Sequence, residues 1–218
     1  MKMFRGIPAG LLGMLFAAFA GLATAETLET QKIITALTGD FNSDGAQDLV
    51  LIAETKPTDP FDMHFFLRDK QQNYLKPVEV VHDQIYGEWI AYDQPGYGNP
   101  DPKPQLSALP NGSILLKIPA MPVGRRRTDQ TLTLAYREGQ FVVAGFAYQF
   151  HDYEEDSVTD SDALRSRCDY NLLTGKGRSA EKDKRGRIVE KVVSVPRQIV
   201  AFRDWEFSTS VEACGNTE

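Results

Sequence analysis

The sequence is poor in the residues and motifs that usually mark an enzyme site. It holds only three histidines among its 218 residues, His64, His82 and His151. It contains no GxSxG nucleophile elbow, no HExxH zinc motif, no phosphate-binding P-loop and no GxGxxG dinucleotide fingerprint. These absences argue against the enzyme classes that such motifs mark. Paired carboxylates for glycoside hydrolysis stay open, because their separation of about 5–10 Å is set in space and not along the chain.

Positive charge is also scarce. The chain has 24 lysines and arginines against 30 aspartates and glutamates, which gives a formal net charge of −6. Nucleic acids and anionic membranes are bound by basic surfaces that neutralise phosphate. We therefore expect no nucleic-acid partner.

Long hydrophobic runs are confined to the first 25 residues. Lys2 and Arg5 precede an apolar stretch at 11–22, and Ala23-Thr24-Ala25 offers the small residues at which signal peptides are cleaved. The pattern predicts a signal peptide at 1–25 and a single β-rich domain at 26–218, periplasmic or secreted. The alternative is an uncleaved membrane anchor, but the apolar run is shorter than the roughly 20 residues that span a bilayer. No later segment is long and apolar enough to span one, so we expect no membrane-spanning segment after cleavage.

Cysteine is rare, and both copies lie in the predicted mature chain. Cys168 and Cys214 are too far apart for a redox-active CxxC motif. An even number of cysteines in an exported chain favours a disulfide between them, with two free thiols as the alternative.

Helical periodicity is missing, whereas short runs rich in β-branched and aromatic residues recur. Asn111-Gly112 and Glu138-Gly139 are typical hairpin turns between such runs. We expect a mainly β protein, an antiparallel sheet folded into a sandwich or partly closed barrel. The predicted strands lie at 32–37, 49–52, 63–68, 75–81, 114–118, 131–136, 141–150, 188–195 and 198–202.

One loop has the spacing of a metal site. Carboxylate or amide side chains occur at Asp40, Asn42, Asp44 and Asp48, a backbone carbonyl is available near Ala46, and Gly45 permits a sharp turn. Calcium takes six to eight oxygen ligands, and this set at 39–48 predicts a calcium site. The alternative is a metal-free turn in which the Asp and Asn side chains accept backbone N–H groups.

This loop lies between two predicted strands, and position twelve of the pattern is Leu51 where an EF-hand needs glutamate. In that form it resembles the calcium-binding loops of FG-GAP and VCBS repeats in integrin-like propellers and secreted bacterial proteins. Residues 136–145 and 169–176 also look like a pattern in uncharacterised exported bacterial proteins that carry such a loop. The resemblance implies a single exported β-domain and implies no activity.

Aromatic residues gather in a stretch that is rich in glycine and proline. They offer either a stacking surface for a glycan or protein ligand, or a lid that packs on the sheet. The residues of this possible ligand surface are Tyr86, Trp89, Tyr92 and Tyr97.

The acidic run at 152–162 favours a solvated loop, with a second cation site as the alternative. The basic stretches at 125–127 and 176–187 favour solvated loops in the same way.

Three functions are compatible with these features. The favoured one is a non-enzymatic exported β-domain, stabilised by calcium and one disulfide, that binds a protein or glycan in the cell envelope. The alternatives are an envelope polysaccharide hydrolase with paired carboxylates, and an inhibitor or accessory subunit of a secreted enzyme.

Overall fold

The computed structural model describes residues 32–55, 60–85, 103–118, 125–153, 159–206 and 214. Within these residues the chain is mainly strand. The first strands are β1 (Lys32–Gly39), β2 (Asp48–Glu54), β3 (Phe61–Asp69), β4 (Tyr74–Ile85), β5 (Gln105–Ala108) and β6 (Ile114–Ile118). The remaining elements are β7 (Arg126–Arg137), β8 (Gln140–Asp152), the short helix α1 (Asp160–Ala163), β9 (Leu164–Asn171), β10 (Lys176–Lys182), β11 (Ile188–Ser194) and the 3-10 turn η2 (Phe202–Asp204).

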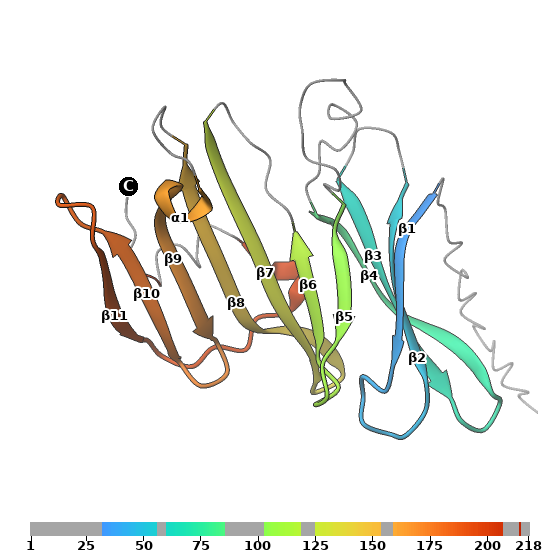
Figure 1. Cartoon of the computed structure of the whole chain (residues 1–218). Helices are drawn as coiled ribbons and strands as arrows, with labels where there is room; N and C mark the ends of the chain where they lie inside the picture. Colours follow the sequence, from blue (N-terminus) through green and yellow to red (C-terminus); the bar gives the residue numbers. More distant parts are fainter. Residues whose placement is uncertain are drawn as a thin grey trace, which may run out of the picture.

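The strands form two antiparallel sheets. The four-stranded sheet has the order β1-β2-β3-β4, and the seven-stranded sheet has the order β11-β10-β9-β8-β7-β6-β5. Figure 1 shows β1 beside β5 where the two sheets meet. The expectation of a mainly β antiparallel sandwich is confirmed, and the sheets do not close into a barrel.

One hydrophobic core joins the two sheets. Alternate residues of the seven-stranded sheet, such as Leu116, Leu132 and Phe146, are buried in register with one another. They belong to the same cluster as Phe65 of β3, whose ring stacks on Phe141 of β8 with 4.0 Å between centroids. Successive side chains of a strand point to opposite faces, so the intervening residues of the large sheet face away from this core.

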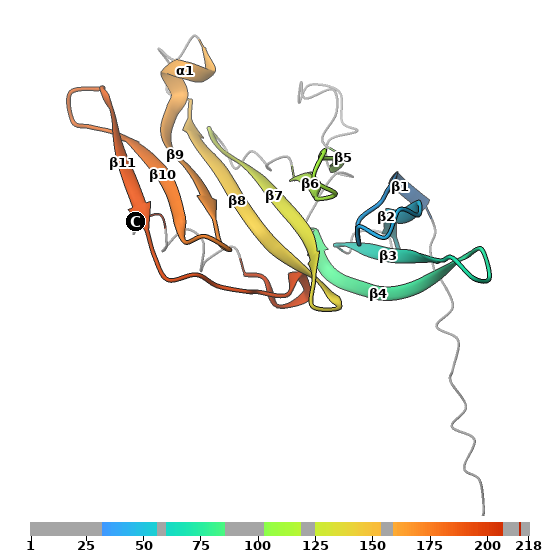
Figure 2. The same ribbon diagram turned by 90° about the horizontal axis from the view of Figure 1, so that it is seen from below.

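The chain after β11 covers the core side of the large sheet. Figure 2 shows this tail along the lower side of β8, β9 and β10. Phe202 and Trp205 of the tail are buried, and Val143 donates its backbone N–H to the Val200 carbonyl. The tail thereby gives β8 an apolar cover, with 5.6 Å between the centroids of the Trp205 and Phe146 rings.

Three sequence expectations about local structure were wrong. Residues 125–127 are not a solvated loop, because Arg126 and Arg127 begin β7 and pair with Asp152 and His151 of β8. Residues 198–202 form only an isolated bridge, Val142 with Ala201, followed by η2, because this segment crosses the sheet instead of joining its edge. The stretch at 176–187 is not a loop, since β10 occupies Lys176–Lys182 and pairs with β9 and β11. Its alternate charged side chains face solvent, which hides the strand from a hydrophobicity pattern.

Candidate functional site

The loop predicted to bind calcium connects β1 to β2 and folds around its own aspartates. Asp40 accepts the backbone N–H groups of Asp44 at 2.9 Å and Gly45 at 2.8 Å. The Asp44 N–H also lies 3.1 Å from the side-chain oxygen of Asn42. Three of the predicted ligands therefore share one turn, in which Ser43 and Gly45 adopt positive φ.

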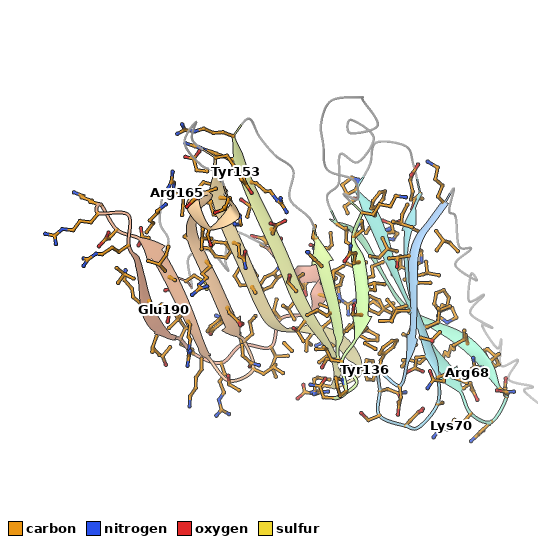
Figure 3. The ribbon with its side chains drawn as sticks, in the orientation of Figure 1. Arg68, Lys70, Tyr136, Tyr153, Arg165 and Glu190 are labelled. Atoms are coloured by element: carbon orange, nitrogen blue, oxygen red, sulfur yellow. A yellow bond between two sulfur atoms is a disulfide. The ribbon has the colours of Figure 1, made fainter. Side chains whose placement is uncertain are left out.

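Asp44 is the half-buried centre of this turn. Its carboxylate accepts the Ala46 N–H at 2.8 Å and the Asn42 amide at 3.1 Å. The Lys70 ammonium lies 3.7 Å from the Asp44 carboxylate. Figure 3 labels Lys70 at one end of the small sheet. The Ala46 N–H is the main cause of a lowered pKa at Asp44, and the Asn42 amide and Lys70 lower it further. The carboxylate is thus held in its ionised form, which is the form that binds a cation.

Asp48 has a different place from the other three. It is fully buried and accepts the backbone N–H of Phe41 and of Arg68, both at 2.9 Å. These bonds fasten the loop to β3 from the inside. Each carboxylate oxygen has two acceptor positions, so these contacts leave capacity for a further bond.

The loop also touches the second sheet. A side chain at Gly112, in the turn between β5 and β6, would come within 2.8 Å of the Asp40 carbonyl oxygen. Gly112 has φ of +77°, a conformation that glycine adopts without steric cost. The loop is therefore a contact between the two sheets.

The donor set fits calcium, which prefers oxygen ligands. Within nine residues, Asp40 and Asp44 offer half-buried carboxylates, Asn42 an amide oxygen and Asp48 a buried carboxylate. Among the described residues, no group of three His, Cys, Asp or Glu side chains converges on a metal-binding position. The same turn meets the description of the metal-free alternative, since Asp40, Asp44 and Asp48 all accept backbone N–H groups.

The predicted disulfide is present. Cys168 on β9 is bonded to Cys214, with 6.1 Å between their Cα atoms, and both residues are buried. The bond fastens the chain beyond the tail to the core side of the large sheet.

A hollow surface lies on the other side of that sheet and was not predicted. It is a groove of about 570 Å³ that crosses β6 to β11, and we call it the polar groove. Its lining residues are Lys117, Asp129, Thr131, Ala147, Tyr148, Gln149, Arg167, Cys168, Asp169, Arg178, Ser179, Ala180 and Glu190. Most of them are the outward-facing residues of their strands, and Figure 3 labels Glu190 at the β11 end.

Ion pairs fix the positions of some side chains in and beside the polar groove. Arg167 contacts Glu190 at 2.6 Å across β9, β10 and β11, and Arg127 contacts Asp129 at 3.1 Å along β7. The groove contains charges of both signs, three basic residues, Lys117, Arg167 and Arg178, and three acidic ones, Asp129, Asp169 and Glu190. Such a surface presents both hydrogen-bond donors and acceptors to a ligand.

Two histidines have defined neighbours in space, an aspartate in one case and a tyrosine ring in the other. His82 Nδ1 lies 3.0 Å from Asp62, a buried carboxylate that also accepts the Thr55 hydroxyl at 2.6 Å. The sequence offered only Asp83 as a neighbour, because Asp62 is on the adjacent strand β3. His151 is buried and stacks on Tyr153 with 6.0 Å between centroids.

The other predicted sites have mixed outcomes. Tyr86, Trp89, Tyr92 and Tyr97 lie outside the described residues. In the acidic run, Asp152 is buried and held by Arg125 at 2.6 Å, while Asp162 belongs to α1 and accepts the Thr159 hydroxyl.

No family model, no curated protein and no solved structure matches the chain. Among the described residues, no helix is long and apolar enough to cross a membrane. The candidate sites therefore rest on their own geometry.

Proposed function

We propose that the protein is an exported, non-enzymatic β-domain that binds a protein or glycan of the cell envelope. The polar groove carries this proposal. It lies on the face of a sheet whose other face is fixed by the core, the tail and the disulfide. A rigid support of this kind lowers the entropy lost on binding.

The carboxylates of the groove favour binding over hydrolysis. Asp129 and Glu190 are each held in an ion pair with an arginine. Asp169 lies on β9, between strands that carry no further groove carboxylate, β8 and β10. A glycosidase needs two carboxylates that face each other across the scissile bond.

The binding function is tested by sedimentation of the purified mature protein with the insoluble envelope fraction of the source cells. Ala147→Trp fills the middle of the groove with a large ring and is expected to reduce the bound fraction at least tenfold. Ala36→Trp, at an exposed alanine on β1, is the matched control and should bind like the wild type. Equal binding by both variants would exclude the groove as the binding site, and release of sugar from the envelope would favour the hydrolase.

We also propose that the loop at 39–48 binds one calcium ion, as its likeness to FG-GAP and VCBS loops suggests. Asp40, Asn42, Asp44 and Asp48 would supply side-chain oxygens and Ala46 its carbonyl. Bound calcium would neutralise a cluster of negative charge at the contact between the two sheets. Its role would be stability and not catalysis.

Calcium is expected to raise the melting temperature. At a concentration 100 times the dissociation constant, the ion stabilises a folded protein by about 2.7 kcal/mol, which is roughly 5–10 °C for a chain of this size. Scanning calorimetry in calcium and in chelator measures the shift. Asp44→Ala should abolish it, whereas Glu181→Ala, which removes an exposed carboxylate on β10, should leave it unchanged. An equal midpoint in calcium and chelator would contradict the calcium site.

Lys70 is expected to compete with the ion. Its ammonium lies beside Asp44, so Lys70→Met removes a positive charge that repels calcium. The calcium dissociation constant should fall by roughly 3–5-fold, the factor that corresponds to an exposed charge pair of up to 1 kcal/mol. Calorimetric titration measures it, with Lys76→Met on β4 as the control. Equal dissociation constants in the two variants would place the ion away from Asp44.

A further inference from the structure

The polar groove has a floor of small side chains. Thr131 on β7 stands directly opposite Ala147 on β8, and Ala180 on β10 stands opposite Arg167 on β9. These residues face away from the core, so their short side chains leave a depression between longer neighbours. The volume of about 570 Å³ is in the range that holds a small ligand of several rings.

A single row of residues crosses the floor at right angles to the strands. Lys117, Thr131, Ala147, Asp169 and Arg178 are successive partners in the sheet register from β6 to β10. Neighbouring strands are about 4.8 Å apart, so the row spans roughly 19 Å between the Cα atoms of its two ends. A ligand that follows this row must be an extended chain of several units.

The two ends of the row are positively charged and exposed. Within the part of the chain that the structure describes, neither Lys117 nor Arg178 takes part in an ion pair, whereas Arg127 and Arg167 are paired. Asp169 and Gln149, both exposed, lie between them and provide acceptors and an amide donor. The row therefore offers two cations for acidic groups and a central set of hydrogen-bonding groups for hydroxyls.

This chemistry does not fit a peptide strand or a nucleic acid. A peptide that adds to a sheet pairs with backbone groups at an edge, but the groove lies on a face where those groups are already used in the ladder. A nucleic acid carries a phosphate at every unit and needs a cation for one phosphate after another, whereas the row has cations only at its two ends, Lys117 and Arg178.

We propose that the polar groove binds an acidic oligosaccharide, a hydroxyl-rich chain with carboxylate groups that lies across the strands from Lys117 to Arg178. The inference rests on the proposed binding function and names its ligand class. Lys117 and Arg178 hold the carboxylates near the two ends, Asp169 and Gln149 bond to hydroxyls, and Ala147 allows a sugar ring to lie close to the sheet.

The test is a calorimetric titration of the mature protein with three probes. These are a uronic-acid tetrasaccharide, its fully methyl-esterified form, and a tetraglutamate peptide. The uronic-acid probe is expected to bind at least tenfold more tightly than either of the others, and its affinity should fall as salt is added because charge pairs are screened. Arg178→Ala and Lys117→Ala should each weaken it 5–10-fold. Arg185→Ala removes the same charge from an exposed turn outside the groove and should not change it.

The other outcomes separate this inference from the broader function. Equal binding of the acidic and esterified sugars would overturn the acidic class and leave glycan binding in place. Preference for the peptide would overturn the glycan and favour a protein ligand. If no probe binds while envelope sedimentation still depends on Ala147, the ligand class is wrong; if sedimentation also fails to depend on Ala147, the proposed function fails with it.

Discussion

Replacing Phe65 by alanine is expected to lower the free energy of unfolding by about 3–5 kcal/mol, the usual cost of removing a large buried ring. Phe65 has no exposed surface, stacks on Phe141 of the other sheet and meets Phe202 of the tail edge-on at 6.3 Å. One side chain thus holds together the small sheet, the large sheet and the tail. Urea denaturation measures the loss.

The neighbouring residue provides the control for this variant. Phe66 follows on the same strand, points to the other face and is only half-buried. Phe66→Ala removes the same ring and is expected to cost about 1 kcal/mol, as is typical away from a packed core. Equal losses for the two variants would mean that Phe65 does not join the sheets. Separate unfolding transitions of the wild type would lead to the same conclusion.

Loss of the disulfide is expected to destabilise the fold by about 4 kcal/mol. Cys168 and Cys214 are 46 residues apart in sequence, and a cross-link of this span removes much of the freedom of the unfolded chain. The double variant Cys168→Ala, Cys214→Ala should unfold at lower urea than the oxidised wild type. Thiol titration of the unfolded, unreduced wild type should detect no reactive cysteine.

The reduced wild type is the control for the disulfide experiment. It keeps both side chains, so its stability should match that of the double variant if the bond itself supplies the effect. A reduced protein as stable as the oxidised one would show that core packing holds the tail in place without the disulfide. A double variant much less stable than the reduced protein would show that most of the lost stability comes from the packing of the two buried side chains.

The sequence predicted those features that depend on residues close together along the chain. The strand at Ile114–Ile118 is apolar throughout its inner face, and the turn at Asn111-Gly112 requires the glycine that the sequence provides. The disulfide followed because the chain has only two cysteines. The acidic loop followed because its donors are neighbours in sequence.

The polar groove could not be predicted in that way. Its row of five residues comes from five strands, and only the sheet register brings Lys117 and Arg178 onto one line. The strands β9 and β10 carry charged residues on their outer face, which gives them a polar composition typical of loops. The contact of His82 with Asp62 depends in the same way on pairing between β3 and β4.

The tail after β11 affects the order in which the molecule can form. Phe202, Trp205 and Cys214 are members of the central cluster, although they lie near the end of the chain. A chain that leaves the ribosome from its N-terminus cannot complete that cluster until Cys214 has emerged. The last step of core assembly therefore depends on residues that are made after both sheets.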